Sequence, residues 1–267
     1  FDMKTTAADP TAPLLLERNG AIATLRFNRP EALNAIDVPM ANAFLTAVQS
    51  IAADPGVRAV VLRGNGRGFM AGGDLATLRA DPVQGAIDIL TPLNQALQLL
   101  AQMNAPVIAQ VHGAAAGAGL SLVLMADYVI AAEGTRFNLA YINLGTSCDV
   151  GASWALPRIV GVRKALEIAL LGEAFTADDA LRLGLINRIV PAVELDSATT
   201  TLAQRLAAGP TVAYGAMKRL MRASMDRTLP EQLAAEKDAF VHCAGTEDFR
   251  AGVEAFHQRQ SPQFVGR

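Results

Sequence analysis

Residues His112–Ala132 read HGAAAGAGLSLVLMADYVIAA, and this stretch decides the fold class. Small residues dominate His112–Leu120, which predicts a turn whose backbone can approach a neighbour or a ligand closely. The run Gly113–Ala126 is short for a membrane span and ends at the charged Asp127, so it is interpreted as a buried helix. The segment Asp127–Ala132, which is apolar after its first two residues, predicts a strand. Turn, helix and strand in this order indicate an α/β protein with crossover connections.

The alternation of strands and helices continues toward the N-terminus. Strands are predicted at Leu14–Arg18, Ala21–Phe27, Val57–Gly64 and Pro106–Gly113, and the pair Asn19-Gly20 predicts a hairpin between the first two. Helices are predicted from Asp37 to Asp54 and from about Val83 to Met103. From about Gly151 onward we expect a mostly helical chain. The domain organisation expected is a disordered tail at residues 1–13, a core at 14–200 and a helical region at 201–267.

The composition is that of a folded globular protein. The 267 residues are 51% hydrophobic and 18% charged, and 23 Lys and Arg are balanced by 25 Asp and Glu spread along the chain. This balance predicts no nucleic-acid partner and no membrane surface as partner. Cys148 and Cys243 have no metal-ligand spacing, so we expect no metal site, two free thiols and a reducing, cytoplasmic location.

Two glycine-rich turns are the strongest chemical features. The first is GFMAGGDL at Gly68–Leu75, and the second is HGAAAGAGL at His112–Leu120. Free N–H groups in such turns favour developing negative charge, so two turns that face one another would form an oxyanion hole. A single turn of this kind more commonly serves tight packing. Neither turn has the glycine and lysine spacing of a dinucleotide or phosphate loop.

Together with the segments around them, these two turns resemble those of the crotonase, or enoyl-CoA hydratase/isomerase, superfamily. The resemblance rests on RPEALNAI (29–36), GRGFMAGGDL (66–75), the stretch 112–132, LPRIVGVRKALEIALLGEAFTADDALRLGLINRIV (156–190) and GVEAFHQRQSPQF (252–264). It implies an α/β spiral of ββα units with a C-terminal helical trimerisation region, assembled as a homotrimer or a dimer of trimers. It also implies an acyl-CoA thioester substrate and no cofactor beyond its CoA part.

The resemblance also implies roles for individual residues. The thioester oxygen would bind the backbone N–H groups of Gly73 and Ala118. Substrate and CoA would contact the remaining candidates, which are Glu31, Ala32, Leu33, Ala71, Asp74, Leu75, Tyr141, Phe256 and Arg259, the last two often across a subunit boundary. Asp74 also fits as the cap of a helix beginning at Leu75, and Arg259 as an ordinary solvated arginine. Residues 76–85 are expected to form the edge of the acyl pocket.

The reaction depends on which carboxylates are present. The positions of the two glutamates of a hydratase of this family hold Ser121 and Tyr141 here. Asp149, eight residues beyond Tyr141, matches the single acid of the enoyl-CoA isomerases. A carboxylate among apolar neighbours can act as a base whose pKa burial raises, and one base suffices to move a proton between two carbons. The sequence therefore predicts an isomerase with Asp149 as its base.

Other interpretations of Asp149 stay open at this point. The sequence DVGA would also fit the N-cap of a following helix. Asp149 could instead activate water through Tyr141, which would make the protein a hydratase. A dehalogenase is less favoured, because the partner histidine of that subfamily would fall at Asn94. Finally, the missing glutamates are compatible with a relative that binds acyl-CoA, or RNA, without turnover.

Overall fold

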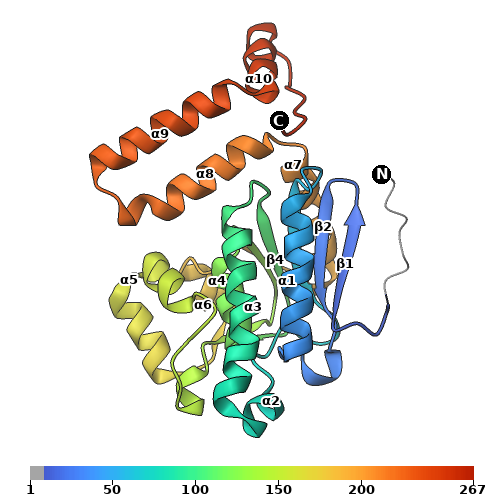
Figure 1. Cartoon of the computed structure of the whole chain (residues 1–267), viewed down its shortest axis with the longest axis vertical. Coiled ribbons are helices and arrows are strands. Elements are labelled where there is room, and N and C mark those ends of the chain that lie inside the picture. The colour runs from blue at the N-terminus through green and yellow to red at the C-terminus, as the bar shows by residue number, and fades with distance from the viewer. Residues whose placement is uncertain (1–8) are drawn as a thin grey trace.

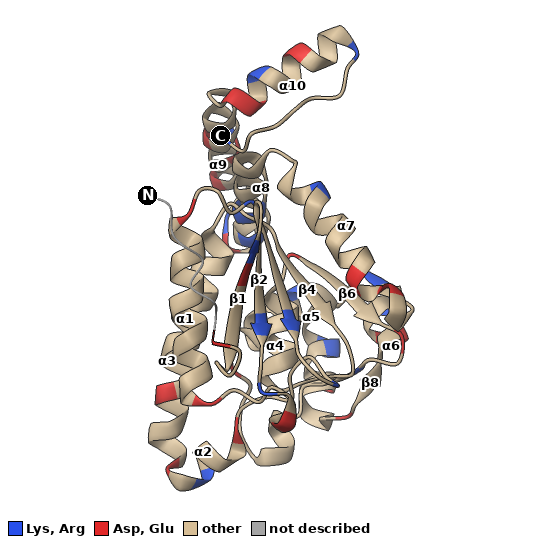
Figure 2. Ribbon diagram, turned by 90° about the vertical axis from the view of Figure 1, so that its right-hand side faces the viewer, with Lys and Arg blue, Asp and Glu red and all other residues tan. Residues whose placement is uncertain are grey.

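The computed structural model describes residues 9–267, in which a six-stranded sheet lies between helical layers (Figures 1 and 2). The strands are β1 (Leu14–Asn19), β2 (Ile22–Phe27), β3 (Ala59–Gly64), β4 (Val107–Val111), β6 (Tyr128–Ala132) and β9 (Arg188–Val190), adjacent in that order. β1 and β2 form the predicted antiparallel hairpin, and all other pairs are parallel. The central strand β4 is buried along its whole length, as expected for a parallel strand covered on both faces.

Helices cover both faces of this sheet. On one face, α1 (Val38–Ala53) packs beside α3 (Pro82–Gln102), and on the other lies α7 (Leu195–Ala207) (Figure 2). α1 begins where predicted, because the Asp37 carboxylate accepts a hydrogen bond from Met40 N at 2.9 Å. Between β3 and α3 lies the short helix α2 (Leu75–Ala80).

One expectation from the opening stretch is wrong. Residues 113–126 do not form a single helix, because Ala114–Ala116 form strand β5 and the helix, α4, covers only Ala118–Met125. β5 joins β7 (Arg136–Asn138) and β8 (Phe175–Thr176) in a second, three-stranded sheet. Alanine favours helices, but here pairing with Met70 on one side and with β7 on the other overrides this local preference.

The chain after Gly151 is mostly helical, as predicted, but two short strands interrupt the helices. After Gly151 come α5 (Ala152–Leu171), β8, α6 (Ala177–Arg182) and then β9, which extends the main sheet beside β6. Strands therefore continue well past the expected change of character. The boundary predicted between residues 200 and 201 falls inside α7, which packs on β3, β4 and β6.

The last three helices project from the sheet-containing part (Figure 1). They are α8 (Thr211–Ala223), α9 (Leu229–Ala244) and α10 (Glu247–Gln258). Short 3-10 helices complete the described chain at Pro30–Ala32 (η1), Tyr141–Leu144 (η2), Ala192–Glu194 (η3) and Ser224–Asp226 (η4). Lys218 and Arg222 of α8 pair with Asp127 at 2.7 and 2.8 Å, so partly buried charge pairs anchor α8 at the N-terminal end of β6.

Two further findings concern the predictions made for the ends and surface of the chain. Residues 1–8 of the expected tail lie outside the described residues, and in its remainder Pro10 and Ala12 accept hydrogen bonds from the Asn28 amide at 2.9 Å each. Between residues 9 and 267, no helix has the length and apolar character needed to cross a membrane.

Candidate active site

The first glycine-rich turn, Gly68–Leu75, is held between two neighbouring segments by backbone hydrogen bonds. On one side, Asp74 N donates to Ile36 O at 2.8 Å, and on the other, Met70 N donates to Ala114 O at 3.0 Å. The path of the turn is therefore fixed from both sides before any ligand binds.

The two predicted turns face one another through their glycines. Gly72 and Gly117 have φ values of +105° and +52°, a region that residues with a side chain rarely adopt. A Cβ on Gly72 would lie 3.4 Å from Ala116 O, and a Cβ on Gly117 would lie 3.4 Å from the Cα of Gly72. Glycine is favoured at both positions by the positive φ, and the distances show that the two backbones lie within van der Waals reach of each other.

This close approach places two backbone donors at one cavity. Ala118 is the first residue of α4, so its N–H has no partner inside the helix. Within residues 9–267, neither Ala118 N nor Gly73 N donates a hydrogen bond to another protein group. Both residues line the same cavity. Preorganised, unengaged donors of this kind can stabilise an oxyanion, so the geometry is compatible with the role expected for Gly73 and Ala118.

The cavity has a volume of about 590 Å³ and is largely apolar. One wall is formed by α2 and α3, and the opposite wall by η2 and the loop that follows it. The lining side chains of the first wall are Leu75, Leu78, Arg79, Pro82, Ala86, Ile89, Leu90 and Leu93, and those of the second include Tyr141, Leu144, Thr146, Cys148 and Asp149. Of the described residues that line it, Asp149 is the only carboxylate and Arg79 the only strong base.

The Asp149 carboxylate is hydrogen-bonded to Tyr141, which in turn contacts Ser121. Tyr141 Oη donates to Asp149 Oδ1, and the same hydroxyl lies 2.9 Å from Ser121 Oγ. α4 supplies Ser121, η2 supplies Tyr141, and the loop before α5 supplies Asp149. The alternative that Asp149 caps α5 is wrong, since Gly151 holds that position and no side chain caps the helix. Ser121 and Tyr141, at the positions where the family resemblance places two glutamates, therefore meet Asp149 in one cluster.

The surroundings of this cluster shift the pKa values of Asp149 and Tyr141. Burial raises the pKa of the Asp149 carboxyl above its ordinary value, and the hydrogen bond from Tyr141 opposes that rise. Burial, together with the charge of Asp149, also raises the pKa of Tyr141 far above its ordinary value. Tyr141 therefore stays a neutral donor, while Asp149 is a carboxylate with a raised affinity for protons.

The other residues predicted to contact the substrate are divided between two places. Ala71 and Leu75 line the cavity, as does Tyr141. The segment that holds Glu31, Ala32 and Leu33 lies beside the first turn, because Ala71 N donates to Leu33 O at 3.0 Å. Glu31 itself is exposed.

Asp74 has the capping role that the sequence left open. Its carboxylate accepts hydrogen bonds from Ala76 N and Thr77 N at the start of α2, at 2.9 and 3.3 Å. It also pairs with Arg29 at 2.8 Å. These contacts tie α2, one wall of the cavity, to the segment before α1.

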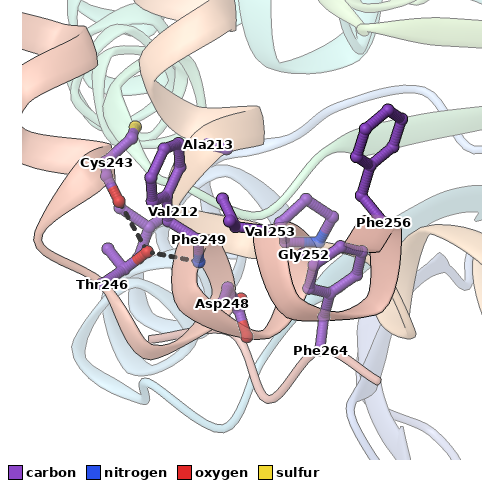
Figure 3. Close-up of a pocket in the computed structure, with 11 residues that line it drawn as sticks. Val212, Ala213, Cys243, Thr246, Asp248, Phe249, Gly252, Val253, Phe256 and Phe264 are labelled. Carbon is purple, nitrogen blue, oxygen red and sulfur yellow. Dashed lines mark hydrogen bonds between the residues drawn. The ribbon is translucent and has the colours of Figure 1, made fainter. Parts of the chain in front are cut away.

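Phe256 and Arg259 are not brought to this cavity within one chain. Phe256 lies on α10 with 81% of its surface exposed, and Arg259 ends that helix. Phe256 contributes to a separate apolar cavity of about 350 Å³ (Figure 3). Phe249, Val253 and Phe264 line the same cavity.

Sequence reasoning missed the wall contributed by α3. The expected pocket edge, residues 76–85, supplies Leu78, Arg79 and Pro82, but Ala86, Ile89, Leu90 and Leu93 lie beyond it. Their spacing of three or four residues after Pro82 is that of one helix face, which was the available signal. Both cysteines are free, as expected, and Cys148 lines the cavity next to Asp149. Nowhere in the described part of the chain do three His, Cys, Asp or Glu side chains group as a metal site.

Comparison with known proteins matches nearly the whole chain. The enoyl-CoA hydratase/isomerase family model matches residues 17–267. A probable enoyl-CoA hydratase of Rhodobacter capsulatus is 37% identical, over 94% of this chain and 97% of that protein. The 1,2-epoxyphenylacetyl-CoA isomerase of Escherichia coli is also 37% identical, over 92% and 95%. The crystal structure of an enoyl-CoA hydratase of Mycobacterium smegmatis has a TM-score of 0.88 at 33% identity, covering 94% of this chain and 98% of that one.

Proposed function

The chain belongs to the enoyl-CoA hydratase/isomerase family of enzymes, and from this premise we propose that it moves the double bond of an enoyl-CoA thioester, with Asp149 as the single base. The observation that carries the proposal is the content of the cavity. One partly buried carboxylate lines the same space as two unengaged backbone donors. Ser121 and Tyr141 occupy the positions at which the family resemblance places two glutamates.

The reaction proceeds in two proton transfers. An oxygen of the Asp149 carboxylate takes a proton from C2 of a 3-enoyl thioester, and the electron pair of the C–H bond enters a dienolate. The N–H groups of Gly73 and Ala118 bind the enolate oxygen, each stabilising the transition state by about 3 to 4 kcal/mol. The proton on Asp149 then adds to C4, which gives the 2-enoyl thioester and restores the carboxylate. No oxidation state changes, so the reaction requires no redox cofactor.

The raised pKa of Asp149 suits this role. A base that must remove a weakly acidic proton works best when its pKa approaches the working pH. The hydrogen bond from Tyr141 occupies Oδ1, which leaves Oδ2 of the carboxylate for the substrate. The aliphatic walls exclude water from the dienolate and strengthen the field of the two donors.

A hydratase is the second candidate, because close relatives carry that name. Asp149 would then take a proton from water, while Tyr141 stays its hydrogen-bond donor. The product would be a 3-hydroxyacyl thioester, heavier than the substrate by one water.

The two candidates are separated by their products. Purified protein is incubated with 3-enoyl-CoA and, separately, with 2-enoyl-CoA, and the thioesters are identified by chromatography and mass. Conversion of 3-enoyl-CoA to 2-enoyl-CoA without a mass change, absent in Asp149→Asn, supports the isomerase. Addition of water to 2-enoyl-CoA would favour the hydratase over the isomerase. Turnover of neither substrate would contradict both candidate functions.

We also propose that the projecting helices meet further copies of this chain. Large apolar side chains are exposed along α9 and α10, including Phe240, Val241, Phe249, Val253 and Phe256. Phe256 and Arg259 lie away from the cavity of their own chain, so any contact that they make with CoA would be to a substrate held by a neighbouring copy. A homotrimer, or a dimer of trimers, would bring this about.

A further inference from the structure

Hydroxyl groups link α4 to the proposed base. The Ser121 hydroxyl lies within donating distance of two oxygens, Gly117 O at 3.2 Å and Tyr141 Oη at 2.9 Å, and Tyr141 Oη donates to Asp149. Ser121 is completely buried, and Tyr141 is 9% exposed. Water therefore has little access to these hydroxyls, and their partners are the ones that the fold supplies.

Ser121 lies beside the peptide that carries one of the two candidate oxyanion donors. Gly117 O and Ala118 N belong to the same peptide unit, and Ala118 N faces the cavity. Gly117 O also accepts a hydrogen bond from Ser121 N at 3.0 Å, while Gly117 N donates to Asn138 O at 2.9 Å. These two hydrogen bonds fix the peptide and hold Ser121 at a set distance from it. A side chain that bonds to Ser121 is therefore also placed relative to the peptide.

The number of available protons determines which group donates in each of these hydrogen bonds. An ionised Asp149 has none, so the bond to Tyr141 must use the single proton of the phenol. The phenolic oxygen is then free to accept a hydrogen bond. The Ser121 hydroxyl also has a single proton, and of its two possible acceptors Tyr141 Oη, at 2.9 Å, is nearer than Gly117 O, at 3.2 Å. Hydrogen bonds aligned in one direction strengthen each other.

We propose that Ser121 is a positioning residue, which donates to Tyr141 and thereby holds the Tyr141 hydroxyl against Asp149 at a fixed place relative to the Gly117–Ala118 peptide. Ser121 does not touch the reacting atoms. It acts through Tyr141 by keeping the phenol pointed at Asp149 and by making it a stronger donor. The carboxylate then stays ionised to lower pH than its burial alone would allow.

Few other charges can influence Asp149 in the cavity. η2 and the following loop contribute Tyr141 and Cys148, and α2 contributes Arg79, which is exposed at the cavity wall. The lining residues of α3 and the start of α4 carry no ionisable group. Substitution of Ser121 should therefore change the pH midpoint of Asp149 through Tyr141. If so, the same substitution has no effect on the midpoint once the phenol of Tyr141 is removed.

The experiment measures the ionisation of Asp149 without substrate. Infrared spectra of the whole protein are recorded across pH, and the protonated carboxyl band of Asp149 is identified by its absence in Asp149→Asn. Wild type, Ser121→Ala, Tyr141→Phe and the double variant are compared. We expect Ser121→Ala to raise the pH midpoint, by less than Tyr141→Phe does, and to add nothing in the Tyr141→Phe background. Ser121→Cys, which retains a weak donor, should fall between Ser121→Ala and wild type.

Thr135→Val is the matched control, because Thr135 is equally buried and its hydroxyl bonds only to Ala132 O, at 2.7 Å. It should leave the midpoint unchanged. An unchanged midpoint in Ser121→Ala, or an equal shift with and without the phenol, would overturn the proposal. The proposal rests on the proposed function, in which Asp149 is the base. Because the titration needs no turnover, its outcome is independent of the isomerase assay, and failure of the one is distinguishable from failure of the other. Where turnover is measured, Ser121→Ala should lower kcat by roughly three- to tenfold with little change in KM.

Discussion

The phenolic hydroxyl of Tyr141 donates a hydrogen bond to the carboxylate of Asp149, eight residues further along the chain. Among residues 9–267, neither side chain has another ionisable hydrogen-bond partner, and both line the apolar cavity with Gly73 and Ala118. A buried carboxylate with one neutral donor keeps a raised affinity for protons, whereas a pairing cation would have lowered it.

Replacing Asp149 with asparagine should reduce kcat for double-bond movement by about a thousandfold or more, because the proton acceptor is removed while the shape is kept. The measurement is steady-state kinetics with 3-enoyl-CoA. Asp88→Asn on α3 is the control, since this exposed carboxylate interacts with Gln84 and does not line the cavity. Equal activity of Asp149→Asn and wild type would rule out Asp149 as the base.

The same substitution should stabilise the fold at neutral pH. Burial raises the pKa of Asp149 above 3.8, its ordinary value, so its protonated form favours folding at acid pH. That contribution is lost as the pH rises through the folded-state pKa, because a charge must then be buried. Asparagine is never charged. Thermal unfolding from about pH 4 upward should therefore show a Tm advantage for Asp149→Asn that grows with pH until Asp149 is fully ionised in wild type. A constant difference would contradict this.

Tyr141→Phe should move the acidic limb of kcat/KM to higher pH. The phenol stabilises the ionised carboxylate, so its removal leaves the effect of burial unopposed and raises the pKa of Asp149. Activity requires the carboxylate, so it should be lost at a higher pH on acidification. The pH profile is measured beside that of Tyr214→Phe, whose hydroxyl lies on α8 outside the cavity and should leave the limb in place.

Ala118→Pro should remove one oxyanion donor with little damage to α4. Ala118 is the first residue of the helix, where proline is tolerated because the N–H has no helical partner. We expect kcat to fall by about 100- to 1,000-fold, and further if the ring obstructs the thioester oxygen.

Ala177→Pro is the control for Ala118→Pro, because it places the same ring at the first residue of α6, away from the cavity. Circular dichroism and Tm establish that both variants fold. Full activity of a folded Ala118→Pro variant would exclude this N–H from the mechanism.

Charges on the projecting helices should disrupt assembly. Phe240 and Phe256 are 66% and 81% exposed, and the double substitution to aspartate would place charge in an interface built on α9 and α10. Light scattering should give three or six chain masses for wild type and a smaller assembly for the variant. The exposed Glu133→Gln, on the connection after β6, is the control, and a monomeric wild type would refute the proposed trimer.

Much of the fold could be predicted because its signals are local. Asn19-Gly20 set the β1–β2 hairpin, Asp37 capped α1, and the apolar runs of β3 and β4 indicated strands covered on both faces. The two glycine-rich turns were also recognisable, since only glycine adopts the backbone conformation of Gly72 and Gly117 without strain.

The sequence by itself therefore determined most of the elements in the first half of the chain and the identity of the residues able to do chemistry. Only the tertiary structure decided that Ala114–Ala116 pair as a strand, that β9 joins the sheet after a helical segment, and that Asp149 bonds Tyr141 instead of capping α5. Local propensity acts over a few neighbouring residues. Strand pairing and the burial of a carboxylate depend instead on segments that the chain brings together from far apart, and their energies decide between local alternatives of similar stability.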